Sequence, residues 1–396
     1  MPADSGRALA IPLSGWADAQ LAGFITMTGM RPPPGLTGAG LLVERAVLGR
    51  FVVPGLVSAG GGCRLIPARD GWIALNLARP EDRTLLPALF CDGDLDADDD
   101  DAIASRCAMH DAARLLERGR EMGLAIASVD ERPVSPPLDV VVRGLPASPG
   151  RSRPPLVIDL SALWAGPLAT HLLSLAGARV VKVESRTRPD AMRDGDPALF
   201  ALLNQEKASV AVDLRDPADR AALIALIERA DIVMEAARPR ALLQAGIDAD
   251  AIMGRVPGLV WTTITGHGVR GQAGDWVGFG DDCAIASGLG AAMLSTCGRP
   301  AFVGDAIADP LTGIAAAAAT WAQWTSGKGA RLMLSMSATA RAALDTERER
   351  TGDALDASLR QWAAAAGQPL VGTARSPAGP LAPFGHDTAD WLRAPC

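Results

Sequence analysis

Apolar runs of strand length alternate with amphipathic helical segments through the C-terminal part of the chain. The runs expected to form strands lie at 156–160, 179–185, 209–214, 231–236 and 259–265. Between them, residues 166–178 and 216–230 carry apolar side chains at helical spacing. Largely apolar strands that alternate with helices are typical of a parallel sheet covered on both faces. The pattern therefore predicts an α/β fold with a doubly wound parallel sheet.

The N-terminal part has a weaker pattern. Residues 71–90 predict a strand and then a helix, and residues 111–129 predict a helix and then a strand, so a smaller α+β domain is expected here. Residues 131–155 are rich in Pro, with Gly and Ser near the end, a composition typical of a linker. We therefore predict three parts: a small α+β domain at 1–135, a Pro-rich linker at 136–155, and the α/β domain with C-terminal helices at 156–396.

Composition narrows the class of protein. Hydrophobic residues make up 48% of the chain and charged residues 21%, and no apolar run approaches the roughly 18 residues of a membrane helix. The first residues lack a basic region followed by an apolar core, so a soluble, cytoplasmic protein is expected, without a membrane partner. The net charge of -7 argues against bulk attraction to nucleic acid.

Residues that commonly bind metals are dispersed along the sequence. The six cysteines show neither close pairing nor a C-x-x-C spacing, and the four histidines are too scattered to form a cluster. The acidic run at 91–101 has the D-x-D-x-D spacing of a calcium loop, but its sixth position is not Gly and its twelfth is Ile103. We therefore predict no disulfide framework and no metal site.

Several segments, in one order, resemble a known family. They are DLSALWAGPLATHLLSLAGARVVKVESRTRPDAMR (159–193), LLNQEKASVAVDLRDPADR (202–220), ADIVMEAARPRALLQAGID (230–248), LVWTTITGHGVRGQ (259–272) and GDAIADPLTGIAAAAATWAQWTSGKGARLMLSM (304–336). Together they resemble the family III CoA-transferases, also called the CaiB/BaiF family. Residues 68–90 and 117–133 resemble the small domain of that family, which ordinarily follows the nucleotide-binding-like half. The order is therefore permuted here.

The resemblance implies a fold and an activity. Members of the family have a Rossmann-like domain, are typically interlocked homodimers, and move CoA from an acyl-CoA to an acceptor carboxylate. It follows that acyl-CoA and a carboxylic acid are the expected substrates, with no tightly bound cofactor, and that a homodimer is the expected assembly.

Asp309 is the expected catalytic carboxylate. In the family the nucleophile is an Asp with Gly four residues later at the start of a helix, and ADPLTG puts Asp309 and Gly313 in that relation. Judged from the residues alone, Asp309 could simply cap its helix, because Pro310 is a favoured first residue. Asp305 is the alternative nucleophile. Asp281 lies where transferases of the family carry an acidic or polar active-site residue.

Further residues match family positions near CoA. The AGP turn at 165–167 lets CoA approach the backbone, although an ordinary strand-to-helix turn has the same composition. Basic residues of the KVE…R, NQEK and RP motifs could hold CoA phosphates, or could be ion-paired on the surface. Gln244 stands where relatives often carry Arg. The residues expected at CoA are Leu163, Trp164, Ala165, Gly166, Lys182, Arg193, Lys207 and Arg238.

Two glycine-rich segments have competing interpretations. Gly60, Gly61 and Gly62 match the flexible loop that covers the nucleophile in some relatives, or form a plain turn. GHGVRG at 266–271 fits G-x-G-x-x-G after a strand, but residues 272–280 do not open a helix. A dinucleotide site is therefore not expected.

Two other functions stay open. A 2-methylacyl-CoA racemase or epimerase belongs to the same family, but it needs a base on each face of the α-carbon. Racemases carry a His just before the Ala-Ser-Gly segment, and residues 278–288 contain none. A non-catalytic CoA-binding subunit is suggested by the permuted order and by Gln244.

Overall fold

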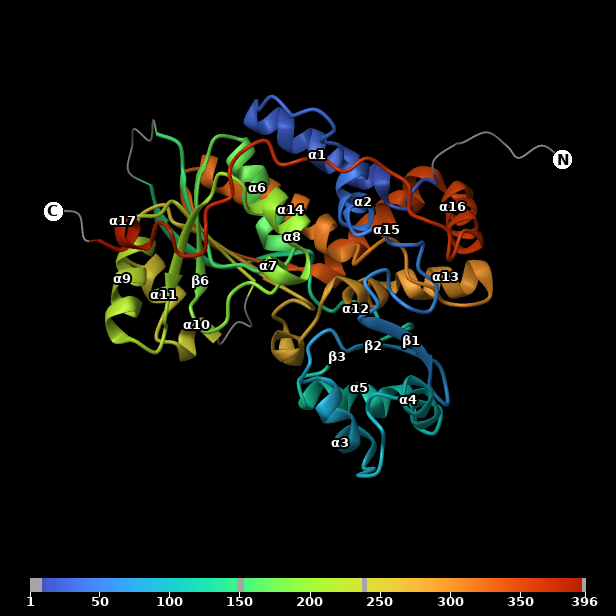
Figure 1. Ribbon diagram of the computed structural model, residues 1–396. Coiled ribbons are helices and arrows are strands. Elements are labelled where there is room, and N and C mark those ends of the chain that lie inside the picture. Colours follow the sequence, from blue (N-terminus) through green and yellow to red (C-terminus); the bar gives the residue numbers. More distant parts are fainter. Residues whose placement is uncertain (1–8, 148–152, 237–240, 394–396) are drawn as a thin grey trace.

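The computed structural model describes residues 9–147, 153–236 and 241–393, which form one large and one small sheet (Figure 1). The large sheet has the strand order β4-β10-β9-β8-β5-β6-β7. Its neighbours pair in parallel, except that β4 and β10 are antiparallel. The strands are β4 (Leu138–Pro146), β5 (Leu156–Asp159), β6 (Arg179–Ser185), β7 (Ala208–Val212), β8 (Ile232–Glu235), β9 (Val260–Thr265) and β10 (Lys328–Ser335).

Helices cover both faces of the large sheet, because successive strand residues point to opposite sides. Val157 of β5 belongs to one hydrophobic core and Ile158 to another. Helices α6 (Ala165–Leu175), α8 (Pro197–Asn204) and α14 (Ala308–Thr325) pack in the first core, and α9 (Pro217–Ile227) and α11 (Ala249–Met253) pack in the second (Figure 1). The predicted doubly wound α/β arrangement is confirmed.

The remaining helices of the large domain are short, or follow the last strand of the sheet. They are α7 (Met192–Gly195), α10 (Ala241–Gln244), α12 (Gly280–Ala284), α13 (Gly290–Cys297), α15 (Met336–Thr351), α16 (Asp353–Ala364) and α17 (Thr388–Leu392), with a 3-10 turn η2 (Gly271–Asp275) and a π turn η3 (Ile285–Leu289). Within the described part of the chain, no helix combines the length and the apolar character needed to cross a membrane.

The first two helices belong to the large domain, which differs from the expected boundaries. Helices α1 (Ser14–Thr28) and α2 (Gly38–Leu48) bury Phe24 and Leu42 in the same core as α6 and α14. Figure 1 shows both helices lying near the orange helices α14 and α15. Val53 still belongs to that core, and the first residue in the small-domain cores is Cys63, so the small domain begins between these two residues.

The segment expected as a linker contains strand β4. It pairs with β10 at the edge of the large sheet, and its β-branched run at 140–142 suits an extended backbone. Pro146 is tolerated because it ends an edge strand. Pro content alone therefore misidentified these nine residues as irregular.

The small domain packs three helices against one face of an antiparallel sheet. The sheet has the order β1-β2-β3, and its other face packs on Ile285, Ala286 and Phe302 of the large domain. The two domains are thus joined by an apolar interface below α12 (Figure 1). The elements are β1 (Cys63–Pro67), β2 (Trp72–Asn76), a 3-10 turn η1 (Arg83–Leu85), α3 (Leu86–Phe90), α4 (Asp100–Cys107), α5 (Ala112–Glu121) and β3 (Ala125–Ser128).

Candidate active site

Asp309 lies in the first turn of α14, facing the start of α6. Its Oδ1 accepts a hydrogen bond from the backbone N–H of Ala165 at 3.3 Å. The other oxygen, Oδ2, lies against Gly280, where a Cβ would overlap it. A Cβ at Gly313 would come within 2.8 Å of the Ala165 carbonyl oxygen, so this glycine lets α14 approach α6. The predicted Asp-x-x-x-Gly spacing thus brings the Asp309 carboxylate to the AGP turn.

Four carboxylates gather around a single guanidinium group. Arg45 of α2 donates from Nη1 to Asp305 Oδ1 at 2.8 Å, and its Nε lies 3.5 Å from Asp196 Oδ2. Asp281, at the start of α12, and Asp309 lie close enough for the charge of Arg45 to act on both. Asp305 Oδ2 is buried and has no hydrogen-bond partner among the described residues. We call Arg45, Asp281, Asp305 and Asp309 the carboxylate cluster.

The acids of the carboxylate cluster have raised pKa values. Burial raises the pKa of Asp309 to about 7, and Asp281 adds to the rise, while Arg45 opposes it. Burial likewise raises the pKa of Asp305 to about 7 against the effect of Arg45. The pKa of Asp281 is also raised by burial, although Arg45 and a hydrogen bond from the Ala306 amide oppose the rise. Asp305 and Asp309 therefore titrate near neutral pH.

The turns beside Asp309 have unusual backbone conformations. Leu163 has a φ of 66° and Ala306 a φ of 41°, in the left-handed region that favours glycine. The Leu163 amide donates to both carboxylate oxygens of Asp190, which fixes the turn. A Cβ at Gly166 would overlap the side chain of Ser161. Strained backbone of this kind occurs at functional sites, where the surrounding structure holds it in place.

Aromatic rings and a glycine loop surround Arg45. Its guanidinium carbon lies 5.7 Å from the centre of the Trp164 ring and 5.4 Å from that of Phe51. A Cβ at Gly60 would lie 3.0 Å from Arg45 Nη2. The Gly60-Gly61-Gly62 loop of the sequence analysis thus begins at the carboxylate cluster. Arg45 itself was missed from the sequence, since an Arg within an amphipathic helical segment carries no local signal of a site.

Lys182 and Lys207 lie in buried ion pairs, which disfavours the contact with CoA phosphates expected for them. Both are almost fully buried, at 2% and 3% exposure, and both are already paired. Lys182 Nζ lies 2.9 Å from Asp190 Oδ2 and 3.0 Å from the Ser161 carbonyl oxygen. The partners of Lys207 Nζ are Asp159 Oδ2 (3.0 Å), the Pro167 carbonyl oxygen (3.1 Å), Thr170 Oγ1 (2.7 Å) and Asn204 Oδ1 (3.0 Å). The four partners of Lys207 leave its ammonium group no donor for CoA phosphates, and both lysines tie buried elements of the fold together.

The other expected cations differ in availability. Arg193 is partly exposed, pairs with Glu184 through Nε at 2.9 Å, and stacks on Phe200 with its guanidinium carbon 4.4 Å from the ring centre. Arg193 therefore stays a candidate contact for CoA at the rim of the large domain. Arg238 lies outside the described residues. Gln244 is exposed in α10.

The G-x-G-x-x-G segment has a packing role. A Cβ at Gly266 would lie 2.9 Å from the Cα of Gly278, and one at Gly268 would overlap Ser135. After the motif the chain forms only the five-residue turn η2. Because no helix begins there, the segment lacks the N-terminal amides that bind a pyrophosphate.

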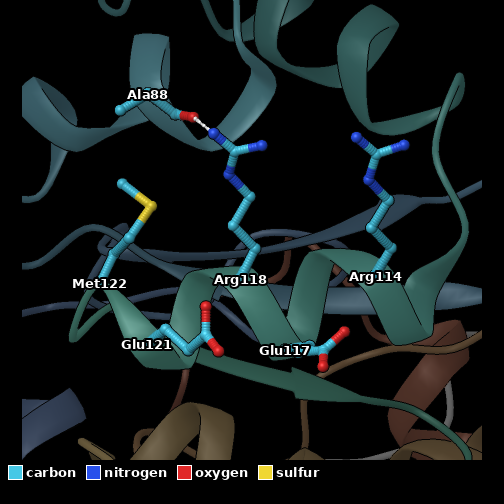
Figure 2. A pocket seen from close by; sticks show the side chains of 6 residues that line it. All are labelled: Ala88, Arg114, Glu117, Arg118, Glu121 and Met122. Atoms are coloured by element: carbon cyan, nitrogen blue, oxygen red, sulfur yellow. Dashed lines mark hydrogen bonds between the residues drawn. The ribbon is translucent and has the colours of Figure 1, made fainter.

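A surface cavity of about 620 Å³ lies apart from these residues, along α5 of the small domain. Figure 2 shows Arg114 and Arg118 pointing the same way from the helix, with Arg118 donating to the carbonyl oxygen of Ala88. Glu117 and Glu121 also line this cavity. With charges of both signs at its surface and none of the predicted site residues, it is not the candidate active site.

One group among the described residues has the composition of a metal site. His267, Asp282 and Cys283 are buried and place one possible ligand atom each within 4.8 Å of one another. The sequence analysis expected no such group, because His267 is distant in sequence from the other two. The fold joins them where α12 packs beside the end of β9.

Comparisons with known proteins point to a single family. Residues 155–366 match the model of CoA-transferase family III. Among characterised relatives, the acetyl-CoA:oxalate CoA-transferase of Acetobacter aceti is 30% identical over 192 residues, which are 46% of this chain and 49% of that protein. The succinyl-CoA–D-citramalate CoA-transferase of Chloroflexus aurantiacus is 32% identical over 168 residues, 41% of this chain and 42% of that protein.

Similar solved structures include the Rv3272 protein of Mycobacterium tuberculosis, at 27% identity and a TM-score of 0.45, covering 52% of this chain and 58% of that one. This chain spans about half the length of the curated relatives that it matches. The matched segment holds Asp309, Asp281, the AGP turn and most of the large sheet. The chain belongs to CoA-transferase family III.

Proposed function

We propose that this protein is an acyl-CoA:carboxylate CoA-transferase with Asp309 as its nucleophile. The carrying observation is the setting of Asp309: a partly exposed carboxylate, held by the Ala165 amide and facing Gly280, beside Arg45. The names of the matched relatives describe CoA transfer to acids such as oxalate and D-citramalate. The substrates proposed here are therefore an acyl-CoA and a carboxylic acid.

The proposed reaction passes through two kinds of covalent intermediate. The Asp309 carboxylate attacks the thioester carbonyl, the C–S bond breaks, and CoA leaves as a thiolate from a mixed anhydride. The thiolate then attacks the Asp309 carbonyl, releasing the donor acid and leaving an aspartyl-CoA thioester. The acceptor carboxylate attacks this thioester to form a second anhydride. The released thiolate attacks the acceptor's carbonyl in turn, which frees acyl-CoA and Asp309.

The carboxylate cluster supplies the charge needed for these steps. Asp309 must be ionised to attack, and Arg45 favours its ionised form against the effect of burial. The backbone amides of Ala165 and Gly280 also favour the anion. A pKa of about 7 leaves a basic carboxylate available at neutral pH, and a more basic carboxylate is a stronger nucleophile.

Trapping with hydroxylamine tests the nucleophile. The protein is incubated with acetyl-CoA, succinyl-CoA and other acyl-CoAs, treated with hydroxylamine, digested and analysed by mass spectrometry. We expect a hydroxamate at Asp309 that is absent in Asp309→Asn, together with at least a thousand-fold slower CoA exchange, roughly what loss of a nucleophile costs. Asp305→Asn should keep the hydroxamate, and the surface variant Asp94→Asn serves as the control.

A hydroxamate on Asp305 instead of Asp309 would transfer the nucleophilic role to Asp305. Binding of CoA by the protein without any hydroxamate or exchange would contradict the transferase and favour the non-catalytic subunit.

An epimerase is the second candidate. Asp305 and Asp309 both have a pKa of about 7, which suits a general acid and base working at neutral pH. Incubating a 2-methylacyl-CoA in deuterium oxide separates the two reactions. Deuterium at C2 without CoA exchange supports epimerisation, and exchange without deuterium supports transfer.

The homodimer and the cytoplasmic location are also proposals, and they rest on the family resemblance and on composition. Light scattering on the purified protein should give twice the mass of the 40.9 kDa chain. A monomeric mass with full activity would contradict an obligatory dimer.

A further inference from the structure

Three side chains with different metal-binding atoms converge beside the carboxylate cluster. His267 follows β9, whereas Asp282 and Cys283 lie on α12. Asp282 Oδ2 is 3.9 Å from His267 Nε2 and 3.8 Å from Cys283 Sγ, and Sγ is 4.0 Å from Nε2. The exposed fractions are 4% for His267 and 0% for the other two. The three atoms thus form a nearly equilateral triangle in the protein interior.

The size of this triangle matches one metal ion. A point equidistant from the three atoms lies about 2.3 Å from each, within a few tenths of an ångström of the ordinary Zn–S, Zn–N and Zn–O bond lengths. Hydrogen bonding alone does not require all three atoms to converge at equal separations. The carbonyl oxygen of Gly266, 3.3 Å from Sγ, lies at the border of the same group.

The surroundings keep the triangle clear of other side chains and orient its members. A Cβ at Gly278 would lie 2.6 Å from Cys283 Sγ and 3.0 Å from His267 Nε2, so only glycine leaves this space free. Asn76 and the Phe279 amide both donate to Asp282 Oδ1 at 3.0 Å, which leaves Oδ2 facing the other two ligands. Outer hydrogen bonds of this kind orient metal-binding carboxylates.

We propose that His267, Asp282 and Cys283 bind one Zn²⁺ ion. A thiolate, a carboxylate and a neutral imidazole suit zinc, and the two negative charges balance the ion in a site without solvent. The site joins α12 to the end of β9. Because α12 begins at Gly280, which contacts Asp309, and continues with Asp281, the ion would hold these residues in place.

The metal content of the whole purified chain tests this proposal. Protein produced in zinc-supplemented medium, dialysed, and analysed by inductively coupled plasma mass spectrometry should carry one zinc per chain. Cys283→Ser and His267→Gln should each weaken zinc binding at least about a hundred-fold, in competition with a chromophoric chelator. Cys107→Ser, which removes a buried thiol from the small domain, is the matched control and should keep its zinc.

A second measurement keeps the proposal testable if a variant fails to fold. Wild-type protein stripped of zinc and given Co²⁺ should show thiolate-to-cobalt charge-transfer absorption and d–d bands of low coordination number. Wild-type protein that binds neither zinc nor cobalt would overturn the proposal and leave Cys283 as a thiol hydrogen-bonded to Gly266. Zinc retained undiminished by both folded ligand variants would also overturn it.

Discussion

Two groups of buried charges in the large domain differ in the balance between positive and negative side chains. In one, Lys182 and Lys207 meet Asp159 and Asp190, so two cations face two carboxylates. We call these four residues the lysine cluster. In the carboxylate cluster one Arg faces three carboxyls, and Asp305 Oδ2 has no hydrogen-bond partner in the part of the chain that the structure describes.

The pKa values follow this difference. Burial alone would raise the pKa of Asp159, but Lys207 and Lys182 lower it to about 2. In the carboxylate cluster Arg45 does not offset burial, and Asp305 and Asp309 keep a pKa of about 7. Opposite charges lower the pKa of a buried carboxyl, whereas an excess of acid leaves groups that change charge at neutral pH, as catalysis requires.

The largest effect should come from breaking the lysine cluster. Lys207→Met leaves the buried Asp159 without its ion-pair partner, so we expect the free energy of unfolding to fall by about 3–5 kcal/mol. Urea denaturation at neutral pH measures this, and Lys328→Met, at an exposed position, is the control. In the wild type, the stabilisation from Asp159 is present above its unfolded pKa near 3.8 and is lost as the pH falls towards about 2. Unchanged stability in Lys207→Met would refute the structural role.

Displacing Asp309 should reduce activity. Gly280→Ala puts a methyl group where Asp309 Oδ2 lies, so we expect the rate of CoA exchange to fall about a hundred-fold, as for a shift of about 1 Å in a reacting group. Steady-state kinetics with the donor identified by trapping measures the rate. Gly23→Ala is the control, because its added methyl group on α1 has no described atom within 4 Å. Full activity of Gly280→Ala would contradict the role of Asp309.

Removing Arg45 from the carboxylate cluster should raise the pKa of Asp309, so that less of this carboxyl is ionised at neutral pH. Arg45→Met takes away the charge that lowers the pKa of Asp309, so the midpoint of the pH–rate profile should rise from about 7 by about one pH unit. Exchange at pH 7 then falls about fivefold, because less Asp309 is ionised, and it recovers at higher pH. Arg31→Met, on the surface, should leave the profile in place. A rate loss that persists at high pH would instead indicate that Arg45 contacts substrate.

The smallest effect should come from Asp281→Asn, which shifts the pKa of Asp309 in the opposite direction. Asp281 raises the pKa of Asp309, so its neutral replacement should move the midpoint of the pH–rate profile to lower pH. Because about half of Asp309 is ionised at pH 7, exchange there can rise by at most about twofold. The asparagine keeps an oxygen for the Ala306 amide. A loss of more than tenfold would show that Asp281 takes part in the reaction directly.

Local patterns predicted much of this molecule. Apolar runs located strands β5 to β9, and the family resemblance, through the Asp309–Gly313 spacing, singled out the carboxylate that meets Ala165. The same patterns assigned α1 and α2 to the wrong domain, because an apolar helix face does not specify which core it joins. They also placed Lys182 and Lys207 at CoA, since a lysine in a motif looks the same whether it is buried in a pair or free.

The sequence by itself determined the alternation of strands and helices, and with it the two-faced parallel sheet, because hydrophobic periodicity acts between near neighbours. Tertiary structure alone decided which charges meet. Arg45 reaches Asp305 across 260 residues, and His267 meets Cys283 through the packing of α12 beside β9. The balance of charge in a buried site depends on such distant contacts and on the water that they exclude. Neither can be predicted from a local segment of the sequence.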